Sequence, residues 1–123
     1  MAGAGGTGNE WESEIYAQGR QINRWPFSDV VADVTRLTAG LDRSKLAFLE
    51  LGCGTGNNIW FFLDCGFEVS GIDIAPTAID LASDYVRSLG FTEADLRVGD
   101  TTGLPWESDS FDFVVDRGVL SQL

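Results

Sequence analysis

Three glycines at alternate positions follow an apolar segment that carries one carboxylate. Residues 46–51 are apolar except for Glu50, and directly after them come Gly52, Gly54 and Gly56. A turn that lacks side chains at every second position lets a ligand approach the backbone closely. The carboxylate of Glu50 favours a ligand with a positively charged group and would repel a pyrophosphate. This pattern predicts a site for a nucleotide-like ligand that carries positive charge.

Further carboxylates end apolar segments later in the chain. They are Asp73 after residues 67–72, Asp100 after 96–99 and Asp116 after 110–115. A carboxylate at the tip of a second strand can accept hydrogen bonds from both hydroxyls of a ribose, each typically worth about 1.5–3 kcal/mol. This feature alone does not distinguish one ribose-containing cofactor from another.

Alternating strands and helices must position these residues. Strands are predicted at 46–51, 67–73, 96–100 and 110–116, and helices at 28–39, 57–63 and 76–89. Ser28 is the expected N-cap of the first helix, and Gly40 and Gly90 follow two helix ends. The alternation predicts an α/β fold, a Rossmann-like open parallel sheet with helices on both faces.

With these residues in place, the chain resembles the class I S-adenosylmethionine (SAM)-dependent methyltransferases. Their first motif is an acidic residue followed by G-x-G-x-G, as at Glu50 and the three glycines. The resemblance continues through Gly99-Asp100, Leu104-Pro105-Trp106 and residues 111–115. The dinucleotide fingerprint G-x-G-x-x-G fails at its third glycine, because Asn57 occupies that position.

The resemblance implies SAM as the cofactor and methyl transfer to a small-molecule acceptor as the activity. In the family, the acid that matches Asp100 and its neighbour Thr101 bracket the adenine ring. No catalytic residue is assigned, because transfer from a sulfonium can rest on proximity and the chain has no histidine to act as a base. The implied cofactor-binding residues are Glu50, Gly52, Cys53, Gly54, Gly56, Asp73, Ile74, Asp100, Thr101 and Asp116.

Each acidic position also has a purely structural alternative. Glu50 could cap helix N–H groups at the strand end, and Asp73 could cap the helix that begins near Pro76. Asp100 could form an Asx turn with the residues that follow it. Asp116 could be solvated or could orient the methionyl part of the ligand.

The chain divides into three expected regions. Residues 1–9 are glycine-rich and predict a flexible tail, residues 10–26 a possible lid segment, and residues 27–123 part of a SAM-binding domain. Residues 10–26 could equally be an amphipathic segment that packs on the sheet. Tyr16 and Arg20 are expected lid contacts, and residues 117–118 could face the acceptor. The sheet is expected to be truncated after its fourth strand, with residues 119–123 beginning a helix, so the chain is interpreted as a fragment.

The amino-acid composition restricts the kinds of molecule that the chain is expected to bind. The formal net charge is −11, with eight basic residues, so no basic patch for nucleic acid is expected and a small-molecule acceptor is favoured. No apolar run approaches the roughly 20 residues of a membrane span. Two cysteines and no histidine give no metal-binding pattern. The cytoplasm is the expected location, and no oligomeric state follows from the sequence.

Two other functions remain open at this stage. A non-catalytic SAM-binding fragment or module would keep the fold without turnover. An NAD-dependent oxidoreductase domain is disfavoured by the glycine spacing and by the charge of Glu50.

Overall fold

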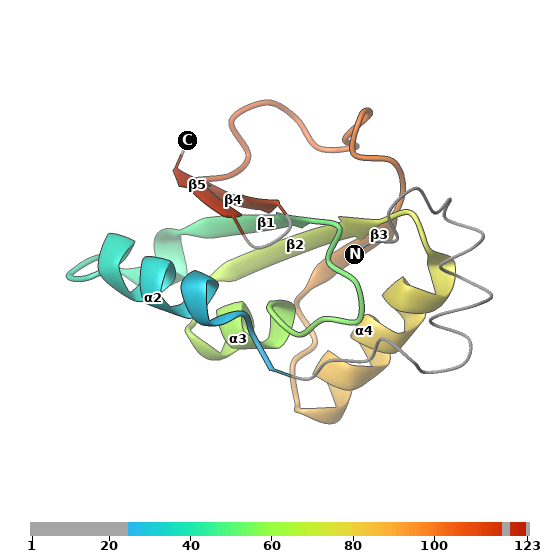
Figure 1. Cartoon of the computed structure of the whole chain (residues 1–123), viewed down its shortest axis with the longest axis horizontal. Helices are drawn as coiled ribbons and strands as arrows, with labels where there is room; N and C mark the ends of the chain where they lie inside the picture. The colour runs from blue at the N-terminus through green and yellow to red at the C-terminus, as the bar shows by residue number, and fades with distance from the viewer. Residues whose placement is uncertain (1–24, 117–118, 123) are drawn as a thin grey trace.

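One five-stranded sheet organises residues 25–116 and 119–122, the part of the chain that the computed structural model describes (Figure 1). The strand order is β3-β2-β1-β4-β5. The first four strands are parallel to one another, and β5 is antiparallel to β4. Their bounds are β1 Ala47–Leu51, β2 Glu68–Asp73, β3 Asp95–Val98, β4 Phe113–Asp116 and β5 Val119–Gln122.

The strand β5 corrects one expectation. We expected residues 119–123 to begin a helix, but Val119 pairs with Asp116 and Gln122 with Phe113 in an antiparallel ladder. Helical spacing cannot be recognised in so short a segment, whereas the apolar edge of β4 offers unpaired N–H and C=O groups to a neighbouring strand. The sheet therefore continues beyond its fourth strand.

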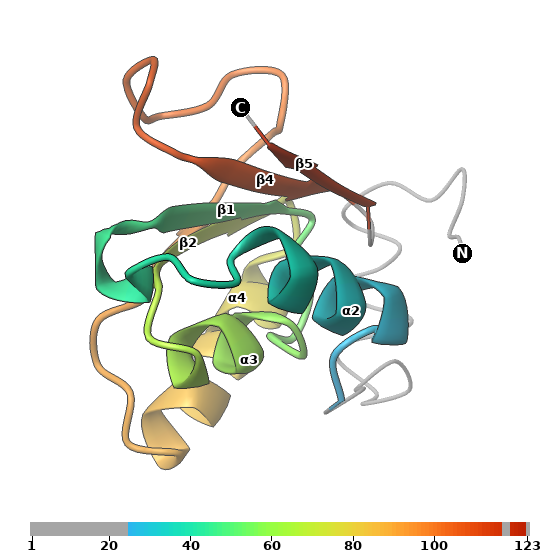
Figure 2. The same ribbon diagram turned by 90° about the vertical axis from the view of Figure 1, so that its left-hand side faces the viewer.

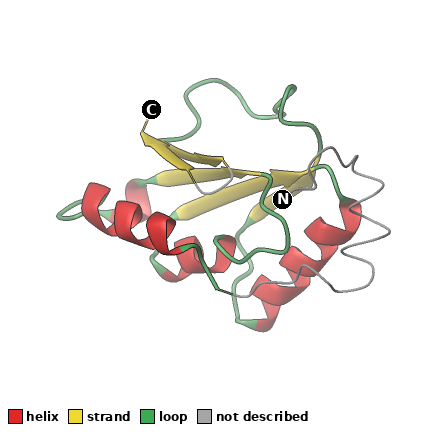
Figure 3. Ribbon diagram, viewed as in Figure 1, coloured by secondary structure: helices red, strands yellow, loops and turns green. Residues whose placement is uncertain are grey.

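The α-helices of the described residues lie on one side of the sheet, as two perpendicular views show (Figures 1 and 2). They are α2 Ser28–Leu37, α3 Ile59–Asp64 and α4 Pro76–Ser88. The crossovers through α3 and α4 both step from β1 toward β3, so their right-handed turn puts both helices on the same face. The return from β3 to β4 is a loop, coloured green in Figure 3. The expected helices on the second face are therefore not found among the described residues.

Aromatic packing fixes β1 at the centre of the sheet. The Phe48 side chain is fully buried, and its ring centroid lies 4.9 Å from that of Phe62, 4.3 Å from Phe67 and 4.7 Å from Phe113. The four rings come from β1, β4, α3 and the loop before β2. Because this cluster joins the sheet to α3, it fixes the amino-terminal end of β1 against the helical layer.

The start of α2 differs from the sequence-based expectation. Phe27 is the N-cap and Ser28 the first helical residue, with no capping hydrogen bond from the Phe27 side chain. The backbone N–H of Phe27 donates instead to Asn58 Oδ1 at 3.0 Å. A partner that lies 31 residues away in sequence thus satisfies the N–H of the N-cap residue, whereas a capping serine would accept from an N–H within the first turn.

Candidate cofactor site

The turn after β1 has the backbone geometry that its glycines predict. Gly52, Gly54 and Gly56 have φ angles of +68°, +57° and +92°, in the left-handed region that residues with a Cβ avoid. A Cβ on Gly52 would meet no atom within 4 Å, whereas a Cβ on Gly56 would lie 3.2 Å from the Cβ of Ala82 in α4. The turn is thus open at its beginning and packed against α4 at its end.

Hydrogen bonds fasten this turn to the end of β2. The N–H groups of Gly52 and Cys53 both donate to the carbonyl of Ile72, at 2.8 and 3.1 Å. Gly54 N donates to Asp73 Oδ2 at 2.9 Å. The carboxyl ends of β1 and β2 therefore form one rigid edge, as expected where a ligand binds an open α/β sheet.

Asp73 is buried at this edge and holds backbone on both sides. Its Oδ1 accepts a hydrogen bond from Ala75 N at 3.0 Å, while Oδ2 accepts from Gly54 N. Ala75 is the N-cap of α4 and has no side-chain capping bond, so Asp73 holds the residue before the helix and does not itself occupy the cap position. Each carboxylate oxygen can accept a second hydrogen bond.

Glu50 lies deeper, beneath the glycine turn. Its Oε2 accepts a hydrogen bond from Asn58 Nδ2 at 2.7 Å, a side-chain contact rather than a cap on helix N–H groups. Its Oε1 is buried and has no hydrogen-bond partner within the described structure. Burial raises the pKa of Glu50 to about 8; the Asn58 bond acts in the opposite direction, and the charge of Asp73 raises it further.

The unpaired oxygen of Glu50 is the site's clearest test of cofactor fit. An unsatisfied buried acceptor costs about 1–3 kcal/mol, and more when it is charged. An ammonium group supplies both the missing donors and the opposite charge. The donor set of this site therefore fits a ligand with a cationic amino group such as SAM.

The remaining predicted residues lie at or beside the same edge. Gly99 N donates to Asp73 O at 3.0 Å and so joins the end of β3 to that of β2. Asp100 accepts from Thr102 N at 3.0 Å, which is the Asx turn kept open as its alternative, and this bond lowers the pKa of Asp100. The side chain of Ile74 is 53% exposed beyond β2.

Three predicted residues differ in their accessibility. Thr101 and Asp116 are exposed, and Asp116 aligns with Leu51 in the register of β4 and β1. Cys53 is buried, and burial raises the pKa of its thiol well above the usual range. A Cβ on Gly71 would lie 3.1 Å from the Cys53 sulfur, so that glycine leaves room for the thiol.

The expected contacts of Tyr16, Arg20 and residues 117–118 lie outside the described residues, as do residues 1–9 and most of 10–26. Within residues 25–116 and 119–122, no group of three or more His, Cys, Asp or Glu side chains could hold a metal ion. No helix in that same part of the chain is long and apolar enough to cross a bilayer.

Sequence reasoning missed two sets of positioning residues. One is Asn58, whose amide is fully buried between Glu50 and Phe27. The other is on the loop between β3 and β4, where Trp106 Nε1 donates to Asp95 Oδ2 at 3.0 Å and the Arg97 guanidinium lies 4.8 Å from the ring centroid. Only the polar asparagine pair after the glycines was a visible signal in the sequence.

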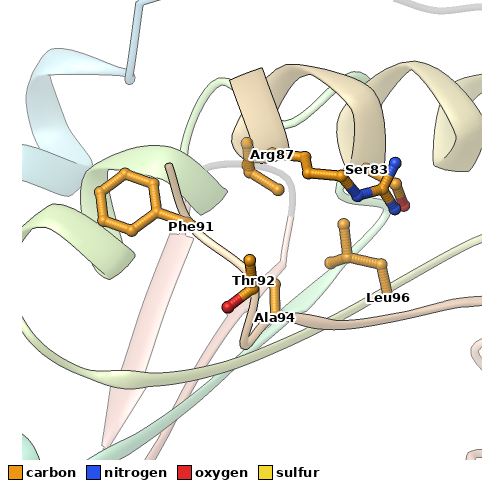
Figure 4. Close-up of a pocket in the computed structure, with 7 residues that line it drawn as sticks. Ser83, Arg87, Phe91, Thr92, Ala94 and Leu96 are labelled. Carbon is orange, nitrogen blue, oxygen red and sulfur yellow. The ribbon is translucent and has the colours of Figure 1, made fainter. Parts of the chain in front are cut away.

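A small hollow elsewhere is separate from this site (Figure 4). It lies between α4 and the segment that leads into β3, so it is at the end of the sheet where the parallel strands begin. The glycine turn and the carboxylates lie where those strands end. The residues labelled there are Ser83, Arg87, Phe91, Thr92, Ala94 and Leu96.

Known methyltransferases resemble this chain in sequence. The family model of the methyltransferase domain matches residues 48–123. A 2-heptyl-1-hydroxyquinolin-4(1H)-one methyltransferase of Mycobacteroides abscessus is 31% identical over 55% of this chain and 30% of its own length. The human EEF1A lysine methyltransferase 2 is 25% identical over 73% of this chain and 40% of its own length.

A solved structure extends the likeness to the fold. The Haemonchus contortus phosphoethanolamine N-methyltransferase 2, in complex with S-adenosyl-L-methionine, superposes with a TM-score of 0.71 at 18% identity, over 88% of this chain and 27% of that one. The chain spans 30% and 40% of the lengths of the two curated relatives. Because the family model covers more than half of the residues, the chain belongs to the class I SAM-dependent methyltransferases.

Proposed function

We propose that this chain forms the SAM-binding part of an enzyme that transfers a methyl group to a small-molecule acceptor. The observation that carries the proposal is the buried, unpaired Oε1 of Glu50 beneath the open glycine turn. A nearby cation lowers the pKa of this carboxyl group and favours its anionic form, so the position fits the cationic amino group of SAM. Family membership and the SAM-bound structural relative support the choice of this cofactor.

The residues at the strand ends take distinct roles in this proposal. Glu50 accepts from the ammonium group, and the backbone at Gly52 and Gly54 lies along the methionyl part. Asp73 accepts from the ribose hydroxyls through the lone pairs that its two backbone bonds leave unused. The remaining proposed cofactor contacts are Cys53, Gly56, Ile74, Asp100, Thr101 and Asp116.

Methyl transfer from SAM requires these residues mainly to align the cofactor with the acceptor. SAM supplies a methyl group on a sulfonium, which leaves as a neutral thioether when a nucleophilic O, N or C atom attacks in line. The rigid edge formed by β1, β2 and the glycine turn holds the reacting carbon in a fixed position, which is where most of the rate enhancement can originate. No residue of the chain is proposed as a general base.

Charge and one relative support a small-molecule acceptor. The net charge of −11 disfavours binding to the negatively charged backbone of a nucleic acid. The mycobacterial relative is named for a hydroxyquinolone, whereas the human relative is named for a protein lysine. A protein side chain is therefore the second acceptor class to test.

The regional assignments also remain proposals. Residues 1–9 are proposed as a tail, 10–26 as a lid over the acceptor and 27–123 as part of the methyltransferase domain within a longer protein. The cytoplasm is the proposed location, supported by the two cysteines Cys53 and Cys65, which form no disulfide.

A SAM titration by calorimetry tests this proposal. We expect saturable SAM binding and at least a tenfold increase in Kd for Asp73→Ala, because the ribose loses its charged acceptor. Asp64→Ala, at the exposed end of α3, is the matched control and should leave Kd unchanged. Binding of NAD in preference to SAM would contradict the proposal. SAM binding without methyl transfer to any acceptor would support the non-catalytic alternative.

A further inference from the structure

Two consecutive asparagines hold the segment that leads into α2. Asn58 Oδ1 accepts from the backbone N–H of Phe27 at 3.0 Å, and Asn57 Nδ2 donates to the carbonyl of Trp25 at 3.0 Å. We call residues 25–27 the strap. Figure 2 shows α2, which follows the strap, beside α3, which follows the asparagines. The end of the glycine turn and the start of α2 are thus fastened together by side-chain amides.

Asn58 also contacts the side-chain carboxyl group of Glu50. Its Nδ2 donates to Glu50 Oε2 at 2.7 Å, and its side chain is 0% exposed, so water cannot replace either bond. One planar amide therefore spans from Glu50 to the backbone of Phe27. A reversed amide would set oxygen against the carboxylate and N–H against N–H, so the two partners fix its orientation.

We propose that Asn58 is a positioning residue for cofactor binding: it fixes the Glu50 carboxylate so that Oε1 faces the ligand's ammonium group, and it links occupancy of the site to the strap. This inference rests on the proposed function, because it concerns the same site. Asn58 itself need not touch the ligand. Its effect on binding passes through Glu50, and its effect on the strap passes through Phe27.

Charge gives the proposal a second, independent consequence. A donor to the carboxylate favours its ionised form, so Asn58 opposes the burial that keeps Glu50 protonated. The titratable groups that face Glu50 among the described residues are Asp73 and Cys53. The charge of Asp73 disfavours ionisation of Glu50, and the buried Cys53 thiol stays neutral. Without Asn58, ionisation of Glu50 should therefore require a higher pH.

The first test is a double-mutant cycle on SAM affinity, measured by calorimetry at pH 7. Asn58→Leu keeps the size of the side chain and removes both hydrogen bonds, so its Kd should rise at least about tenfold. Asn57→Ala breaks only the bond to the strap at Trp25 and should change Kd less than about threefold. In a Glu50→Gln background, Asn58→Leu should add less than about threefold.

Additive losses in this cycle would overturn the proposal, because Asn58 would then act independently of Glu50. The link to the strap has its own measurement, the amide resonance of Phe27. It should move on SAM addition in the parent chain and stay in place in Asn58→Leu. If Asn58→Leu does not fold, Asn58→Ala takes its place, since it also removes both hydrogen bonds and is smaller than the asparagine.

A SAM-free measurement separates this inference from the proposed function. If the parent chain does not bind SAM, the proposed function fails, and the role of Asn58 is decided by urea unfolding across pH. The pH range over which Glu50 ionises should move to higher pH in Asn58→Leu or Asn58→Ala, and should not move in Asn57→Ala. An unchanged range in either Asn58 variant would overturn the positioning role.

Discussion

Replacing Glu50 by glutamine should remove most of the pH dependence of stability between pH 5 and 8. The pKa of Glu50 rises from 4.5 to about 8 on folding. Between these values the folded chain binds a proton that the unfolded chain has lost, so the free energy of unfolding falls as the pH rises. The slope is about 1.4 kcal/mol per pH unit, or a few kcal/mol over the window, and it levels off above pH 8.

Few other described groups of the chain are expected to titrate between pH 5 and 8. The chain contains no histidine, which would otherwise titrate there. Among the described groups, Asp95 and Asp100 have lowered pKa values and act at acidic pH, while Cys53 and Cys65 have raised values and act at alkaline pH. Glu50 is thus the described group expected to dominate between pH 5 and 8.

Urea unfolding at pH 5, 6, 7 and 8, at constant ionic strength and without SAM, measures the effect. Glu50→Gln should match the parent near pH 5, where both side chains are neutral, and be more stable by a few kcal/mol near pH 8. Its SAM affinity should nevertheless fall, because the anionic acceptor is lost. Equal slopes in the two proteins, or a parent slope that rises with pH, would refute the assignment of a buried, protonated Glu50.

Further substitutions test the packing around the site. Phe48→Ala should cost about 3–5 kcal/mol in urea unfolding, since three other rings lie within 4.9 Å of its centroid; a loss below 1 kcal/mol would contradict the central role of this ring. Gly56 and Gly66 have similar φ angles, +92° and +95°, but only a Cβ on Gly56 would meet a neighbour. Gly56→Ala should therefore lower the free energy of unfolding by about 1–3 kcal/mol more than Gly66→Ala. Equal losses would count against the contact with α4. Trp106→Phe removes an indole hydrogen bond to β3 and should cost about 1 kcal/mol, with amide shifts confined to residues 99–112; an unperturbed loop would show that the bond does not position it.

Local sequence patterns were sufficient for the order of the elements. The apolar run before Gly52 predicted β1, and the described strand begins one residue later than expected, at Ala47. The helix predicted at 57–63 begins at Ile59 instead, because Asn58 is its N-cap and Asn57 lies outside it. The family and its open parallel sheet are confirmed by the matched family model and the structural relatives.

The errors arise where a residue's partner is remote or its segment is short. Serine is a favoured N-cap residue, but Ser28 is the first residue of the helix and Phe27 is its N-cap. The backbone N–H of Phe27 donates to the side chain of Asn58. The segment at 119–122 is too short to show a period, and its pairing with β4 decides that it is a strand. The cofactor roles of the strand-end residues stay predictions until binding is measured.

By itself, the sequence determined the glycine turn, the strands with carboxylates at their ends and the family, because these depend on residue types a few positions apart. Tertiary structure decided what the carboxylates do. Gly54 and Asp73 meet across 19 residues and Phe27 and Asn58 across 31, and no local pattern encodes either contact. The fold also buries the Glu50 carboxyl group, where the Asn58 amide donates to Oε2 and leaves Oε1 unpaired.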